Sequence, residues 1–111
     1  MTIEQEVEMF SAYTRELAET FARKRADYGQ TTTETFEKFG PVSMLVRMHD
    51  KLGRLDNLLG TGKVPYNESV IDTLIDLANY SLITLLELQK IKQQHACVAQ
   101  NNETFEGYLK K

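Results

Sequence analysis

The sequence has very little cysteine and no sustained strand-like pattern. Its one cysteine, Cys97, excludes an internal disulfide and a cysteine-ligated metal site. Alternation of apolar and polar residues, the mark of a half-buried strand, is not sustained over any useful length. The sequence therefore predicts an all-α fold. The 111 residues and 41% hydrophobic content predict one domain over residues 1–111, with a polar tail from about residue 97.

The chain also lacks two features that would indicate large charged or lipid partners. Its net charge is −3, and this acidic balance argues against general affinity for a nucleic acid backbone, which needs clustered Lys and Arg. The most apolar segment is interrupted by Asp72, Asp76 and Asn79, and the N-terminus has no basic region followed by an apolar stretch. We therefore expect a cytoplasmic protein without general nucleic acid binding and without membrane contact.

Helical periodicity and turn residues divide the chain into three long helices. The pattern predicts helices over residues 3–27, 41–59 and 68 to about 95, with Pro41 beginning the second and Asn67 capping the third. The polar stretch around residues 30–35 is typical of a loop. A short helix or strand around residues 104–109 is also expected.

Apolar stripes on these helices indicate how they pack. The stripe predicted on the first helix consists of Ile3, Val7, Phe10, Leu17 and Phe21. The stripe predicted on the second consists of Leu45, Met48, Leu52, Leu55 and Leu59. The third helix is apolar on nearly every side and must be covered all round. A homo-oligomer would supply that cover, and a C-terminal helix of the same chain is the competing solution.

Carboxylates inside the apolar third helix require a cation. Asp72 and Asp76 lie four residues apart on one stripe, and an unpaired buried carboxylate is costly. Arg47, Lys51 and Arg54 share one stripe of the second helix and could neutralise these acids or bind phosphates. The sequence leaves two interpretations open: a structural network of ion pairs, or a site for a divalent metal and phosphate.

Three segments carry a resemblance to a known family. They are KRADYG (24–29), GPVSMLVRMHDKLGRLDNLL (40–59) and ESVIDTLIDLANYSLI (68–83). Together they resemble the first type of nucleotide modification associated domain, a small all-α family often encoded by phages and their hosts. The resemblance implies a nucleotide pocket between the helices. The residues that it implies for nucleotide binding are Lys24, Asp27, Tyr28, Arg47, Lys51, Arg54 and Asn79.

The order of acids on successive helices is also similar to the MazG-like all-α nucleoside triphosphate pyrophosphatases. That similarity implies Mg²⁺ held by Asp50, Asp72 and Asp76, and pyrophosphate release from a nucleoside triphosphate. The chain departs from the E-x-x-E and E-x-x-D pattern of those enzymes, so no catalytic residue is assigned. Two alternatives remain open: a protein that sequesters a nucleotide without chemistry, and an interaction module whose charges are only structural.

Overall fold

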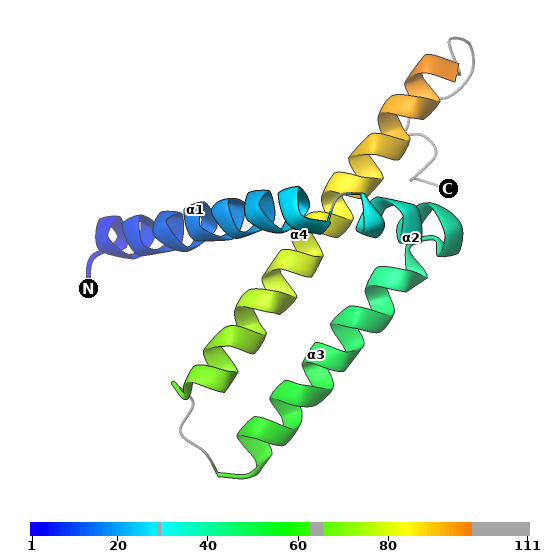
Figure 1. Cartoon of the computed structure of the whole chain (residues 1–111). Helices are drawn as coiled ribbons and strands as arrows, with labels where there is room; N and C mark the ends of the chain where they lie inside the picture. The colour runs from blue at the N-terminus through cyan, green and yellow to red at the C-terminus, as the bar shows by residue number, and fades with distance from the viewer. Residues whose placement is uncertain (29, 63–65, 99–111) are drawn as a thin grey trace, which may run out of the picture.

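The computed structural model describes residues 1–28, 30–62 and 66–98, in which the chain forms four α-helices and no strand (Figure 1). The helices are α1 (Ile3–Tyr28), α2 (Thr31–Phe39), α3 (Val42–Gly60) and α4 (Glu68–Val98). The all-α prediction is confirmed, and the three long helices lie within a few residues of their predicted limits. The short element expected around residues 104–109 lies outside the described residues.

Local sequence signals explain where the long helices begin. At the start of α1, the amide of Thr2 donates to Gln5 Oε1 at 2.8 Å and the amide of Gln5 donates to Thr2 Oγ1 at 3.1 Å, which forms a capping box. Pro41 immediately precedes α3 with a helical φ of −58°. The amide of Ser69 donates to Asn67 Oδ1 at 2.8 Å, so Asn67 caps α4 as predicted.

The prediction of a loop around residues 30–35 is wrong, because α2 begins at Thr31. Three consecutive threonines have low intrinsic helix propensity, but tertiary contacts override that preference. Phe36 is buried, and Thr33 Oγ1 donates to Glu87 Oε1 on α4 at 2.8 Å. Gly40 ends the helix with a φ of 78°, a conformation that favours glycine, and its amide donates to the carbonyl of Phe36.

The helices are arranged around α4. Figure 1 shows α3 and α4 side by side in opposite directions, α2 beside the C-terminal half of α4, and α1 crossing α4 near its middle. The main packing is between α3 and α4, and α1 contacts α4 less extensively. The buried apolar side chains are Leu17, Phe36, Met44, Leu55 and Val70.

The predicted stripe on α3 agrees with the observed one only in part. Of its members, Leu55 is buried and Met48 is half-buried, as predicted, whereas Leu45, Leu52 and Leu59 are exposed. Met44, which was not predicted, is buried. The covered positions also follow a seven-residue spacing. They are Met44, Met48, Lys51, Leu55 and Leu58. Two overlapping stripes of similar spacing exist on α3, and packing against α4 selects the one that includes Lys51.

One further expectation of burial fails in the described chain. Ile3, Val7 and Phe10 are exposed because the N-terminal half of α1 extends beyond α4 (Figure 1). On α4, Ile71 and Leu85 are exposed within the described residues, and their cover by a second copy or by a C-terminal helix stays a prediction. The radius of gyration is 17.4 Å, compared with about 13 Å for a compact domain of this length.

By length and composition alone, α4 could cross a membrane over residues 68–96, with a mean hydropathy of 1.3 in its most apolar window. From the sequence we expected no segment able to cross a membrane. By length and composition, α4 contradicts that expectation. Only 17% of the window is buried. The finding is weak evidence, because a core helix can meet the same criteria.

Candidate functional site

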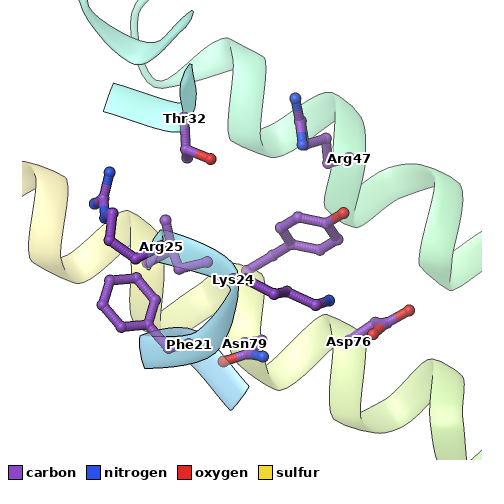
Figure 2. Close-up of a pocket in the computed structure, with 9 residues that line it drawn as sticks. Phe21, Lys24, Arg25, Thr32, Arg47, Asp76 and Asn79 are labelled. Carbon is purple, nitrogen blue, oxygen red and sulfur yellow. The ribbon is translucent and has the colours of Figure 1, made fainter. Parts of the chain in front are cut away.

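A pocket lies where the C-terminal end of α1 meets α3 and α4, with a volume of about 260 Å³. It combines cations, aromatic rings and one amide, and Figure 2 shows how side chains from four helices converge on it. The lining residues are Phe21, Lys24, Arg25, Thr32, Arg47, Asp76, Asn79, Tyr80 and Ile83.

Two of the pocket's cations have no carboxylate partner within the described residues. Lys24 is exposed and makes no hydrogen bond or ion pair there. The Arg47 guanidinium lies 5.8 Å from the centre of the Tyr80 ring, a cation–π contact that leaves its N–H groups available. The pocket's one carboxylate, Asp76, is already paired through Oδ2 with Lys51 Nζ at 3.0 Å. The wall therefore presents positive charge that could bind an anion.

Asn79 is the most informative residue of the pocket. Only 8% of its surface is exposed, yet its side-chain amide makes no hydrogen bond within the described residues. No buried side-chain nitrogen or oxygen there lacks a partner, so the amide atoms of Asn79 retain contact with solvent. Asn79 lines this pocket and also a mostly apolar hollow of about 180 Å³ beside Leu17 and Phe21. A largely buried amide with free donors and acceptors is costly unless water or a ligand satisfies it.

A second polar centre lies further along α4 at Glu87, which is only 2% exposed. Its Oε1 accepts from Thr33 at 2.8 Å and from Lys90 Nζ at 3.0 Å, and Arg25 Nη2 lies 3.6 Å away. Thr33 Oγ1 in turn accepts from Arg25 at 3.2 Å and from Lys90 at 3.1 Å. This closed network joins α1, α2 and α4, and it holds Arg25 at the edge of the pocket.

A wider and shallower hollow of about 860 Å³ adjoins the pocket along α3. Arg47 and Tyr80 line both spaces and separate them. The hollow also contains Asp50, Lys51 and Arg54. The two spaces together could hold an elongated ligand with one ring-shaped end and one anionic end.

The comparison with family models matches residues 24–88 to Nucleotide modification associated domain 1. The match covers more than half of the chain. The chain belongs to this family. No curated protein and no solved structure matches it. The similarity to the MazG-like pyrophosphatases therefore stays a prediction.

The matched segment of this Nucleotide modification associated domain 1 protein contains almost the whole pocket. Of the lining residues, only Phe21 precedes residue 24. Most of α1 lies before the matched segment.

The structure brings together some of the predicted nucleotide-binding residues. Lys24, Arg47 and Asn79 line the pocket. Lys51 and Arg54 lie instead in the adjoining hollow.

Two predicted residues are not part of this group. Asp27 is exposed and lines neither space, and the side chain of Tyr28 lies outside the described structure. The partner suggested for Arg54 also differs. Its Nε donates to the buried hydroxyl of Thr73 at 3.1 Å, not to Asp72 or Asp76.

The predicted metal ligands do not form a cluster. Asp50 lies in the hollow, Asp76 lines the pocket, and Asp72 is exposed and lines neither space. Within residues 1–28, 30–62 and 66–98, no group of three or more His, Cys, Asp and Glu side chains could hold a metal ion. The donor set therefore does not fit a resident metal held by protein alone, and the Mg²⁺ role of these acids stays a prediction.

Sequence reasoning missed Tyr80 and Arg25 at the pocket, and Glu87 in the network. Tyr80 lies four residues after Asp76 and next to Asn79, so helical spacing could have included it. Glu87 interrupts the apolar run LITLLEL, and the argument applied to Asp72 applies equally to it. No local signal pairs Glu87 with Thr33, because the two residues are far apart in the chain.

Proposed function

We propose that this protein binds a phosphorylated nucleotide across the pocket and the adjoining hollow. The observation that carries the proposal is the nearly buried amide of Asn79, which makes no hydrogen bond within the described residues and lines the pocket. An amide offers two donors and an acceptor, the groups needed to recognise a base edge. Phe21 and Tyr80 provide aromatic surface beside it for the base.

The phosphate end is assigned to the α3 side. Arg47 lies between the two spaces, and Lys51 and Arg54 continue the same stripe of the helix in the hollow. Arginine binds phosphate oxygens through paired hydrogen bonds. A base held at Asn79 would direct its phosphates past Arg47 into the hollow.

The proposal is binding, not hydrolysis. Mg²⁺ is commonly held by one or two carboxylates together with substrate phosphates, and Asp50 in the hollow could provide one of them. Asp76 is less available because Lys51 already neutralises it. No arrangement of described acids favours activation of a water molecule. Sequestration of a nucleotide, including a signalling nucleotide, fits this site better than its cleavage.

Calorimetry with deoxynucleoside triphosphates, nucleoside monophosphates and cyclic dinucleotides, with and without Mg²⁺, tests the proposal. We expect Arg47→Ala to weaken the binding of the best ligand about tenfold or more, because it removes a charged phosphate contact. Arg15→Ala is the matched control, since Arg15 is exposed on α1 outside both spaces. Absence of heat with every nucleotide would support the interaction-module alternative, and equal losses in both variants would indicate nonspecific charge attraction.

A further inference from the structure

One apolar stripe on α1 is covered along only half of its length. Its positions recur at alternating spacings of four and three residues, the pattern of a helix seam. In the C-terminal half, Leu17 is buried and Phe21 is half-buried against α4. In the N-terminal half, Val7 is 58% and Phe10 is 72% exposed. The stripe therefore continues beyond the part of α4 that covers it.

The neighbouring surface of α4 is also uncovered. Ile71, Ile75, Ala78, Leu82 and Leu85 form a seam with alternating spacings of four and three, separate from the side that packs on α3. Ile71, Leu82 and Leu85 of this seam are exposed. In Figure 1 the N-terminal halves of α1 and α4 diverge from their crossing like the arms of a V. Leu82 lies at the crossing itself, beside Leu17 and Phe21.

An apolar groove lies inside this V. It has a volume of about 260 Å³, and Leu17, Ile71, Leu74 and Ile75 contribute to its walls, together with the ring of Tyr13. Glu16 also lines it, but its exposed surface is almost wholly apolar, which suits an apolar helix face. The exposed half of the α1 stripe is such a face, and it belongs to the same molecule as the groove. A second copy can therefore place its exposed α1 stripe in the groove of the first copy, while its own groove binds the α1 stripe of the first copy.

Charge along α1 favours an antiparallel approach of two copies. The first 14 residues contain three acids, Glu4, Glu6 and Glu8, and no Lys or Arg. Residues 23–25 are Arg, Lys and Arg. When two α1 helices lie antiparallel, the acidic end of each faces the basic end of the other. Parallel helices would place like charges together.

The exposed apolar area of α1 and α4 matches the apolar part of a dimer contact. The exposed large apolar side chains of these helices each offer roughly 50–100 Å², from the free energy of burying such side chains. Together they reach several hundred Å². A standard interface buries about 800 Å² on each partner, of which roughly 60% is apolar. Contact between copies would thus cover the surface that α4 leaves uncovered in one chain.

We propose that this protein forms a symmetric homodimer in which the N-terminal half of α1 from each copy occupies the α1/α4 groove of the other. The arrangement is isologous, so it closes after two copies and does not extend into a filament. It completes a bundle from α1 and α4 of both chains. The proposal does not rest on nucleotide binding, because the groove and the nucleotide pocket have no lining residue in common, although α1 and α4 contribute to both.

Light scattering of the full chain at micromolar concentration tests the assembly, with Phe10→Glu as the main variant. We expect twice the chain mass for the native protein, and a dissociation constant raised roughly a hundredfold or more for Phe10→Glu. Leu52→Glu is the matched control, because Leu52 is an apolar residue of α3 that is 54% exposed and lies outside the groove. This control should remain dimeric. Circular dichroism of both variants establishes that they fold.

Amide hydrogen exchange locates the contact. In the native dimer, we expect amides of residues 3–13 to exchange at least tenfold more slowly than in Phe10→Glu, because the partner covers this helix half. A monomeric native protein overturns the proposal, whether or not it associates with lipid vesicles. A dimer that Leu52→Glu dissociates, or one with protection confined to α3, also overturns it, because the contact would then lie on another face.

Discussion

Asn79 and Glu87 are both buried polar residues of α4, about 12 Å apart along the helix, and they differ in how they are satisfied. Glu87 is surrounded by a hydroxyl and two cations from three helices. Asn79 has no described protein partner and opens onto a pocket. A buried polar group with a complete set of partners stabilises one arrangement of the chain. One without partners indicates a place where a ligand or water completes the site.

The largest effect on stability should follow the loss of the Glu87 carboxylate. Glu87→Ala removes the carboxylate that lies between Lys90 and Arg25. The two cations and the Thr33 hydroxyl then lose their interactions with Glu87. We expect the free energy of unfolding to fall by about 3 kcal/mol or more. Urea denaturation at fixed protein concentration measures it. A loss below about 1 kcal/mol would mean that the network does not hold the helices together.

A smaller effect should follow the loss of the Thr33 hydroxyl. Thr33→Val preserves the shape of the side chain but removes one hydrogen bond to Glu87 and two acceptor contacts with Arg25 and Lys90. We expect a loss of about 1–3 kcal/mol in the free energy of unfolding. Thr35→Val on the same helix is the control, because Thr35 makes no hydrogen bond with its side chain in the described structure. If the free energy of unfolding falls equally in both variants, the low helix propensity of valine is the cause, and not the loss of the Glu87 hydrogen bond.

Asn79 should behave in the opposite way. Asn79→Leu replaces an amide that makes no hydrogen bond within the described residues with an apolar group of similar size, so we expect stability to stay constant or to rise by up to about 1 kcal/mol. Nucleotide affinity should fall by about tenfold or more, because the base loses its hydrogen-bonding partner. Thermal melts and calorimetry on the same preparation separate the two effects. If Asn79→Leu is destabilised and still binds nucleotide, Asn79 is a structural residue like Glu87 and is not part of a nucleotide site.

The smallest effect is expected for the ion pair between Lys51 and Asp76. Both side chains are partly exposed, with 27% and 39% of their surface accessible, so water and salt weaken their attraction. We expect Lys51→Gln to change the free energy of unfolding by less than about 1 kcal/mol, and the change to diminish in 0.5 M salt. Denaturation at two salt concentrations measures it. A loss of several kcal/mol would show that this pair belongs to a buried network like that of Glu87.

The sequence by itself determined the helical class, the limits of the long helices and the main site region. Apolar periodicity places α1, α3 and α4, and Asn67 and Pro41 mark where two of them begin. The family motifs indicate Lys24, Arg47 and Asn79, and the structure brings these residues together at one pocket. The helix limits are local features, so helical spacing and caps are sufficient to find them, whereas the site residues follow from the resemblance to the family.

Only the tertiary structure decided which surfaces are covered and which charges are paired. The polar stretch that begins α2 is helical because Phe36 and Thr33 find partners on other elements. On α3, the sequence allows two apolar stripes of equal spacing. Packing against α4 buries the stripe that contains Met44, and Leu52 of the other stripe stays exposed. Glu87 has partners on other helices and Asn79 has none within the described residues, because distant segments reach the first side chain and not the second. Helical spacing cannot specify those contacts, since they join residues far apart in the chain.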